Sequence, residues 1–294
     1  MTTAAPDRVQ TQAHAKINLL LRILARETSG YHQIETVFQL LELADDVLVT
    51  RTAAGVALEV HGPDLGPAED NLAVRAAHLV LEATGRTFGV AITLTKRIPV
   101  RAGLGGGSSD AAAVLHGVNA LAGHAVPRHE LEHLGTRLGA DVAFFASGAS
   151  TAVAWGRGER LFRLAGPPAA PALVAVPTET IATPDAYRWW DEMHPDPASR
   201  GPVVLDGAAL ATWGSIGRLG GNDFEVPVFS RHPSLRVVFE KLAATGPLWV
   251  RLAGSGAAVA AVYRSARDRD DAAQSLDPKA ARPIATSTLH GGPS

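Results

Sequence analysis

Four glycines and two serines lie within seven positions of the chain, in the stretch Gly103-Leu-Gly-Gly-Gly-Ser-Ser109. Glycines lack the side chains that would keep a bulky anion away from the backbone. The alanine-rich helix expected from Asp110 to about Leu121 would begin with unpaired amide groups and a partial positive charge. Ser108 and Ser109 can cap that helix or donate hydroxyls to phosphate. The stretch therefore predicts a polyphosphate site, and a flexible turn with a serine cap is the plainer alternative.

Two common phosphate-binding motifs are absent from the sequence. A Walker A motif needs Gly-Lys followed by Ser or Thr, and none of the four lysines follows a glycine. The dinucleotide fingerprint GxGxxG fails at Ser108 when it is started at Gly103, and at Asp110 when it is started at Gly105. The loop belongs to neither class.

A lysine and an aspartate are the candidates for acid–base and electrostatic roles. Lys16 lies among apolar residues in an expected strand, where a lysine is costly to bury unless it is paired, so we expect a functional partner. A strand-edge lysine that reaches solvent is the alternative. Asp141 follows an expected helix over 128–138 and precedes an apolar run, and a simple turn carboxylate fits that position equally well.

The elements that would position these residues alternate between strand and helix patterns, which indicates an α/β or α+β fold. A loop-like Gly166-Pro-Pro168 marks the expected boundary between two domains, 1–165 and 166–294. Strands are expected at 13–24, 36–43, 56–60, 90–95, 173–177, 248–256 and 283–289, and helices at 71–83, 110–121 and 128–138.

Composition narrows the functional class. The 294 residues are 46% hydrophobic and 19% charged, which is typical of a globular protein. A net charge of -2 gives no bulk positive field for nucleic acid or anionic lipid, and the absence of cysteine excludes disulfides and thiolate chemistry. No apolar run approaches a membrane span, and the polar N-terminus lacks the apolar core of a signal peptide. We expect a cytoplasmic protein that binds neither nucleic acid nor membrane.

One short sequence imitates a zinc site. His129-Glu-Leu-Glu-His133 spells the HExxH of zinc proteases. On a helix, Leu131, Leu134 and Leu138 form the buried stripe and both histidines face outward, whereas catalytic zinc needs an enclosed site with a third ligand. We therefore interpret it as a chance match.

The glycine loop and the residues before it, Pro99-Val-Arg-Ala-Gly103-Leu-Gly-Gly-Gly-Ser108-Ser109, resemble the second motif of the GHMP kinase superfamily. Within the superfamily, an ordered series over about 13–289 resembles the 4-diphosphocytidyl-2-C-methyl-D-erythritol kinase family. The series consists of Ala15-Lys-Ile-Asn-Leu19, Gly30-Tyr-His32, Asp70-Asn-Leu72, the glycine loop, Leu138-Gly-Ala-Asp-Val142, Thr183-Pro184, Asn222-Asp223 and Gly254-Ser-Gly256.

The resemblance implies a two-domain α+β fold, with an N-terminal α/β domain that contains a left-handed β-α-β unit and a C-terminal ferredoxin-like domain. It implies phosphorylation of the substrate's 2-hydroxyl, with ATP and Mg²⁺ as cofactors, by a monomer or homodimer. Its rivals are a kinase of this fold that acts on another small alcohol and a non-catalytic ATP-binding sensor.

The resemblance also implies roles for residues. Asp141 would accept the hydroxyl proton while Lys16 steadies developing charge. Tyr31 and Tyr187 would stack on the two faces of the cytosine and His32 would bind its edge. The implied ATP-binding residues are Gly103, Leu104, Gly105, Gly106, Gly107, Ser108, Ser109 and, near the adenine, Asn71; the remaining implied substrate-binding residues are Asn18, Thr183, Gly254 and Ser255. No protein metal ligand is expected other than a hydroxyl of Ser108 or Ser109.

The chain departs from the family pattern in places. Ala143 replaces the proline usual after Asp-Val, and Arg101 and Ala102 stand where small residues are common. Lys96 and Arg97 are open to two interpretations, assistance to the triphosphate or a solvated strand end. Asp110 is interpreted as a first-turn helix acid, and the segment 189–200 matches no motif.

Overall fold

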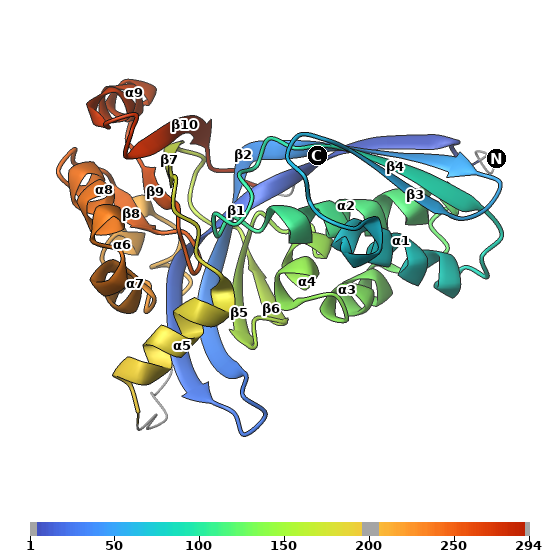
Figure 1. The fold of residues 1–294 in the computed structure, drawn as a ribbon, viewed down its shortest axis with the longest axis horizontal. Coiled ribbons are helices and arrows are strands. Elements are labelled where there is room, and N and C mark those ends of the chain that lie inside the picture. The colour runs from blue at the N-terminus through green and yellow to red at the C-terminus, as the bar shows by residue number, and fades with distance from the viewer. Residues whose placement is uncertain (1–4, 196–205, 292–294) are drawn as a thin grey trace. The chain divides into compact units, whose positions relative to one another are not determined.

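A computed structural model describes residues 5–195 and 206–291 (Figure 1). The chain forms two compact units, each assembled from separate stretches. Unit 1 comprises the chain up to Ala15, Leu43–Val100 and Gly105–Gly148, and unit 2 comprises Lys16–Glu42, Arg101–Leu104 and the chain from Ala149. Across the described residues, no helix is long and apolar enough to cross a membrane.

Unit 1 contains a parallel β-α-β element. Strands β3 (Val56–His61) and β4 (Gly89–Thr95) pair in parallel and are joined through the short η1 (Ala68–Asp70) and helix α1 (Leu72–Ala83). The far side of β4 pairs antiparallel with the end of β2 (His32–Thr52). The handedness of this β-α-β element stays a prediction.

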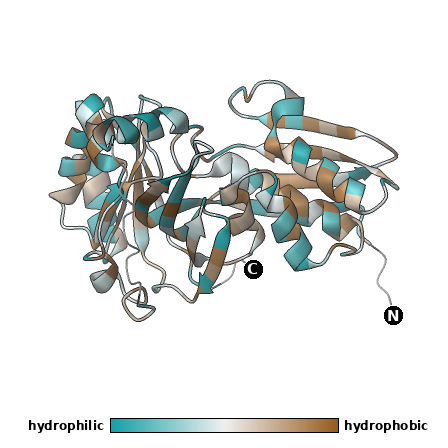
Figure 2. Cartoon of the chain, turned by 90° about the horizontal axis from the view of Figure 1, so that it is seen from below, coloured by the Kyte–Doolittle hydropathy of each residue, from teal (hydrophilic) through white to brown (hydrophobic). Residues whose placement is uncertain are grey.

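Three more helices complete unit 1: α2 (Gly106–Leu121), α3 (Arg128–Thr136) and α4 (Ala140–Ala146). Apolar residues three and four apart give α1 one buried face, and alternation gives β4 a buried face. Helix α2 is instead buried on almost every side from Ser109 to Leu121. Colouring by hydropathy shows this mixture of hydrophobic and hydrophilic positions along the helices and strands (Figure 2). The core includes Val47, Ile92, Val80, Leu115 and Val142.

Unit 2 contains an antiparallel ladder that the sequence pattern did not predict. The start of β2 pairs with β5 (Thr151–Gly156), which pairs with β6 (Arg160–Leu164). Strand β1 (Arg8–Arg26) pairs with β2, and its residues from Lys16 belong to unit 2. The polar–apolar alternation of β5 and β6 covers too few residues for these two strands to be recognised from the sequence alone.

The second sheet of unit 2 confirms the expected ferredoxin-like domain. Its strands β7 (Pro171–Pro177), β8 (Trp249–Leu252), β9 (Val259–Val262) and β10 (Ala281–Ser287) lie in the order β10-β7-β9-β8, all antiparallel. This is the arrangement of a β-α-β-β-α-β chain. Between β7 and β8 lie α5 (Thr183–Met193), α6 (Trp213–Ile216), α7 (Glu225–Arg231) and α8 (Pro233–Ala243), and α9 (Ala266–Ser275) joins β9 to β10.

Several expected bounds change. The strand expected over 248–256 ends at Leu252, because a glycine turn follows, and the strand expected over 36–43 extends to the whole of β2. The helix expected from Asp110 begins four residues earlier, at Gly106. Residues 196–200 of the unmatched 189–200 segment lie outside the described residues. The division at 165 stays a prediction.

Candidate active site

The second half of the glycine loop is the first turn of a helix. Gly105 is the N-cap of α2, with a left-handed φ of 72°, and no side chain caps the helix. The first helical hydrogen bond is donated by the Ser109 amide to the Gly105 carbonyl at 2.9 Å, so the amides of Gly106, Gly107 and Ser108 precede it. The expectation that Ser108 or Ser109 caps the helix is wrong, because the turn starts before them. An anion bound here would therefore accept hydrogen bonds from the backbone amides at the start of α2.

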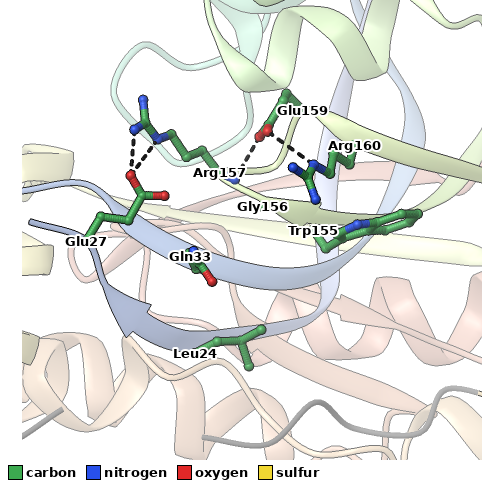
Figure 3. Close-up of a pocket in the computed structure, with 8 residues that line it drawn as sticks. All are labelled: Leu24, Glu27, Gln33, Trp155, Gly156, Arg157, Glu159 and Arg160. Atoms are coloured by element: carbon green, nitrogen blue, oxygen red, sulfur yellow. Dashed lines mark hydrogen bonds and ion pairs between the residues drawn. The ribbon is translucent and has the colours of Figure 1, made fainter. Parts of the chain in front are cut away.

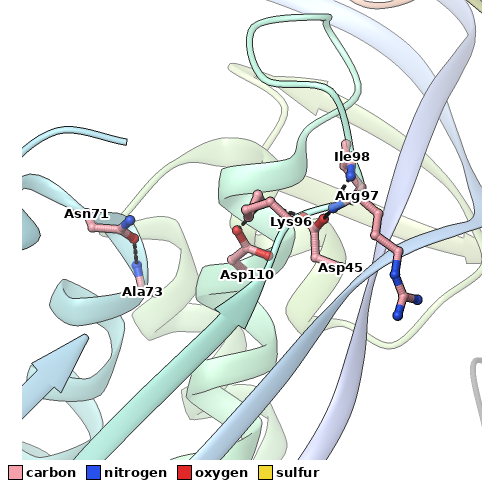
Figure 4. Close-up of polar contacts among 7 residues, drawn as sticks. All are labelled: Asp45, Asn71, Ala73, Lys96, Arg97, Ile98 and Asp110. Carbon is pink, nitrogen blue, oxygen red and sulfur yellow. Dashed lines mark hydrogen bonds and ion pairs between the residues drawn. The ribbon is translucent and has the colours of Figure 1, made fainter. Parts of the chain in front are cut away.

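A buried lysine lies beneath this turn (Figure 4). A Cβ added to Gly106 would lie 3.6 Å from the Lys96 Nζ, and that ammonium donates to the carboxylates of both Asp45 and Asp110. The Lys96 side chain is 4% exposed. Lys96 is therefore not a solvated strand end, and Asp110, in the second turn of α2, is not a first-turn acid. Arg97 by contrast is half exposed and pairs with Asp46.

The two carboxylates of this cluster are held differently. Asp45 accepts hydrogen bonds from the backbone amides of Arg97, at 2.5 Å, and Ile98, at 2.8 Å. Asp110 accepts from Lys96 through Oδ2, while its buried Oδ1 has no hydrogen-bond partner among the residues that the structure describes. Burial raises the pKa of Asp110 to about 7 against the opposing effect of Lys96, and Asp45 adds to the rise. Asp110 can therefore gain and lose a proton near neutral pH.

Asn71 caps helix α1 and borders a cavity. Its Oδ1 accepts the Ala73 amide hydrogen at 2.9 Å (Figure 4), which leaves the amide group of the side chain as a donor. The cavity is about 300 Å³, and its other lining residues include Leu58, Val60 and Leu65. A cavity lined by a few apolar side chains and an oriented amide donor suits a flat heteroaromatic ring.

Asp141 lies in the first turn of α4, after the N-cap Gly139. In that turn it lies at the partially positive end of the helix. Ala143, at the position where the family carries proline, is buried in the same short helix. The helix forms without the proline.

In unit 2, Lys16 is the first member of a hydrogen-bonded series along β1 and β2. Lys16 is 5% exposed, and its Nζ donates to the Asn18 Oδ1 at 2.7 Å. The Asn18 Nδ2 donates to the Thr36 Oγ1 at 2.8 Å, and that hydroxyl donates to the Leu20 carbonyl at 2.6 Å. The series orients the amide of Asn18 so that its oxygen faces the ammonium. The expectation of a buried, partnered Lys16 is confirmed.

The first half of the glycine loop packs against the turn at Gly254-Ser-Gly256, also in unit 2. The Leu104 carbonyl accepts the Lys16 amide hydrogen at 2.9 Å. Gly103 has a φ of 78°, and a Cβ there would lie 1.9 Å from the Ala253 carbonyl oxygen, so only glycine fits. A Cβ on Gly254, whose φ is 54°, would lie 3.4 Å from the Lys16 Nζ. Two glycine segments thus converge on this lysine.

Polar side chains hold the Gly254 turn. Asn222 donates to the carbonyls of Leu252, at 2.9 Å, and Gly254, at 2.6 Å. The hydroxyls of Thr183 and Ser255 are 3.0 Å apart, so these two predicted residues meet. Sequence reasoning gave Asn222 no role, although its Asn-Asp pair belonged to the family resemblance.

The predicted base-binding residues lie along α5 and the β1–β2 turn. The His32 imidazole stacks on Tyr187 with ring centres 4.5 Å apart. Its Nε2 lies 2.7 Å from the Asp191 Oδ1. Tyr31 is 60% exposed and stacks under the Arg157 guanidinium at 4.1 Å. Sequence reasoning missed Asp191, because only the fold brings it to His32.

A cavity of about 340 Å³ lies next to this region (Figure 3). Its lining includes Trp155, Gln33 and the ion pair between Arg157 and Glu27, joined at 2.5 Å. The hydrogen bond from Arg157 lowers the pKa of Glu27, which keeps that carboxylate charged. The guanidinium that stacks on Tyr31 is thereby held in place.

The HExxH histidines are exposed on α3, as expected. No group of three metal-ligating side chains occurs among the described residues. The expectation that both histidines face outward is confirmed, and the interpretation as a chance match stays a prediction.

The predicted residues divide between the units. Whether Lys16 and Asp141 meet stays a prediction, because they belong to different units. Unit 1 holds Asn71, Gly105, Gly106, Gly107, Ser108, Ser109 and Asp141, and unit 2 holds Lys16, Asn18, Tyr31, His32, Gly103, Leu104, Thr183, Tyr187, Gly254 and Ser255.

Comparison with known proteins agrees with this arrangement. Residues 71–149 match the GHMP kinases N terminal domain, and residues 207–282 match the GHMP kinases C terminal domain. The chain is 40% identical over 260 residues to the 4-diphosphocytidyl-2-C-methyl-D-erythritol kinase of Solibacter usitatus, covering 86% of this chain and 80% of that protein. It is 39% identical to the same enzyme of Symbiobacterium thermophilum, covering 86% and 90%.

A solved structure extends the likeness to three dimensions. The crystal structure of a 4-(cytidine 5'-diphospho)-2C-methyl-D-erythritol kinase superimposes with a TM-score of 0.80 at 37% identity, covering 97% of this chain and all of that one. The two chains share the fold over nearly their whole length. The chain therefore belongs to the GHMP kinase family, in its group of 4-diphosphocytidyl-2-C-methyl-D-erythritol kinases.

Proposed function

We propose that this chain transfers the γ-phosphate of ATP to the 2-hydroxyl of 4-diphosphocytidyl-2-C-methyl-D-erythritol, a step in the non-mevalonate route to isoprenoid precursors. The observation that carries the proposal is the convergence of two glycine segments on buried Lys16, in a chain about 40% identical to enzymes with that name. Such a position suits a cation that must meet developing charge on a phosphoryl group or an alkoxide.

Every bond and proton of this reaction is accounted for by the two substrates, water and the side chains of Asp141 and Lys16. The substrate oxygen forms a bond to the γ-phosphorus, and the bond from that phosphorus to the β,γ-bridging oxygen breaks to release ADP. Asp141 accepts the hydroxyl proton and later returns it to water. Lys16 favours the deprotonated hydroxyl and steadies charge in the transition state, which needs positioning and electrostatics more than covalent help.

ATP is held by the backbone of the glycine loop and by the cavity at Asn71. The unpaired amides of Gly106, Gly107 and Ser108 face the phosphates. The adenine enters this cavity, where the oriented Asn71 amide donates to a ring nitrogen. The diphosphocytidyl end of the alcohol substrate lies with Tyr31, His32 and Tyr187, and its erythritol end with Asn18, Thr183 and Ser255.

Magnesium fits this site as a partner of the nucleotide. Mg²⁺ retains several waters and phosphate oxygens and needs few protein ligands, so the lack of a carboxylate cluster among the described residues is compatible with it. The hydroxyl of Ser108 is half-buried in the first turn of α2, whereas Ser109 is buried, so Ser108 is the better candidate ligand. The ion supplies charge neutralisation on the phosphates.

Measuring ADP release with a panel of alcohols tests the proposal. We expect the cytidine-linked methylerythritol to stimulate ATP turnover far more than mevalonate, homoserine or galactose. A His32→Ala variant should lose affinity for that substrate and keep its affinity for ATP. Turnover stimulated by another alcohol would point to a different kinase of this fold, and no stimulation by any alcohol would favour an ATP sensor.

A further inference from the structure

The imidazole of His32 is held on three sides by helix α5. Its Nε2 lies 2.7 Å from the Asp191 Oδ1, Tyr187 stacks on one face, and Trp190 meets it edge-on at 5.9 Å. His32 is 8% exposed, and Trp190 is buried. Both the position and the rotation of the ring are therefore fixed within unit 2, where α5 lies beside the β1–β2 hairpin (Figure 1).

The bond to Asp191 decides which ring nitrogen carries the hydrogen. An ionised carboxylate only accepts hydrogen bonds, so Nε2 must donate. The Arg26 guanidinium lies 3.4 Å from the other oxygen of Asp191 and forms an ion pair with it. In a neutral imidazole with its hydrogen on Nε2, Nδ1 is an acceptor.

The Nδ1 atom remains open to a ligand. Within the described residues, no hydrogen-bond partner of Nδ1 is found, and it is not one of the enclosed atoms that lack a partner. A fixed acceptor at the edge of a buried ring is the complement of an N–H donor.

We infer that Asp191 is a positioning residue that fixes His32 with its hydrogen on Nε2, so that Nδ1 selects a pyrimidine bearing an exocyclic amino group over one bearing a carbonyl. The inference rests on the proposed function, in which His32 binds the edge of the base. Cytosine presents an N4 amino donor, whereas uracil presents a carbonyl oxygen at the same position. An acceptor facing that oxygen is repelled, which gives discrimination against uracil as well as affinity for cytosine.

The ring geometry accommodates such a base. A hydrogen bond to Nδ1 lies close to the imidazole plane, so a base bound edge-on continues that plane. The Tyr187 ring is only 17° from parallel to the imidazole, so it is nearly parallel to that base as well. Tyr187 can therefore stack on the imidazole and on part of the base together.

Nitrogen-15 NMR of the wild-type protein gives the first test, because it distinguishes the two tautomers of a histidine without any ligand. We expect the His32 signal, assigned by its loss in His32→Gln, to show the hydrogen on Nε2. A hydrogen on Nδ1 would overturn the inference, whether or not any Asp191 variant folds.

The second test compares kcat/KM for the cytidine-linked substrate and its uridine-linked analogue. We expect Asp191→Asn to reduce the preference for cytidine about tenfold, because an amide can donate to Nε2 and permit the other tautomer. KM for ATP should not change. Asp191→Glu should restore much of the preference, and the control Glu192→Gln removes a neighbouring charge of α5 that pairs with Arg231 away from His32.

The outcomes separate this inference from the proposed function. Equal kcat/KM of the wild type for the cytidine-linked and uridine-linked substrates would overturn the inference and leave the proposed function standing. No turnover with the cytidine-linked substrate would contradict the proposed function. A wild-type preference that Asp191→Asn leaves unchanged, with the tautomer also unchanged, would overturn the role of Asp191 alone.

Discussion

Each unit contains a buried lysine, and the hydrogen bonds described for the two reach different groups. In unit 1, Lys96 donates to two carboxylates, those of Asp45 and Asp110, directly beneath the first turn of α2. In unit 2, Lys16 donates to the neutral amide of Asn18, beside the glycine segments. The comparison teaches that burial of a lysine does not by itself mark a catalytic group. We interpret Lys96 as support for the phosphate loop and Lys16 as the cation that meets the reacting phosphate.

The largest effect should come from Lys16, the proposed catalytic lysine. We expect Lys16→Met to lower kcat by at least about 10³-fold, because a charge that stabilises the transition state is lost. ATP affinity should change by only a few-fold. Single-turnover kinetics measures the loss in kcat, and nucleotide binding measures the ATP affinity. Near-normal turnover of Lys16→Met would show that Lys16 is not catalytic.

Removing the other lysine should damage stability more than chemistry. Lys96→Met leaves two buried carboxylates without their cation, and we expect a loss on the order of 3–4 kcal/mol in the free energy of unfolding. Urea denaturation would measure it, with the exposed Lys241→Met as control. A wild-type unfolding curve for Lys96→Met would show that the cluster does not support the loop.

The same cluster should make stability depend on pH. Because burial raises the pKa of Asp110 from 3.8 to about 7, the folded protein holds a proton between those values that the unfolded chain releases. Raising the pH through that window therefore destabilises the wild type. Relative to wild type, Asp110→Asn should gain on the order of 1–3 kcal/mol between pH 4 and pH 8. Thermal melts at several pH values would measure this, and parallel curves for the two proteins would refute it.

The smallest effect should come from the hydrogen-bonded series that orients Asn18 and, through it, Lys16. In Thr36→Val the hydroxyl that accepts the Asn18 amide hydrogen is lost, and we expect a decrease in kcat of about tenfold. Thr36→Ser keeps the hydroxyl and should retain most of the activity. Equal losses in both variants would show that packing, and not the hydrogen bond, matters at this position.

The sequence predicted the motifs better than their surroundings. The glycine loop, buried Lys16 and the ferredoxin-like domain were foreseeable, because glycine spacing, a lysine among apolar residues and strand–helix alternation are local signals. The start of α2 at Gly106 was not, since glycines are poor helix formers and only the tertiary structure holds them in a turn. The partners of His32 and Lys96 were not foreseeable either, because Asp191 and Asp45 are brought to them from distant elements.

The assembly of unit 2 from separated stretches has a consequence for synthesis on the ribosome. Phe38 of β2 pairs with Ala152 of β5. The ribosome therefore adds more than 100 further residues after β2 before the pairing strand β5 has been synthesised. At typical elongation rates the delay is on the order of ten seconds. During that time the apolar start of β2 has an unpaired edge, the kind of segment that chaperones bind in nascent chains.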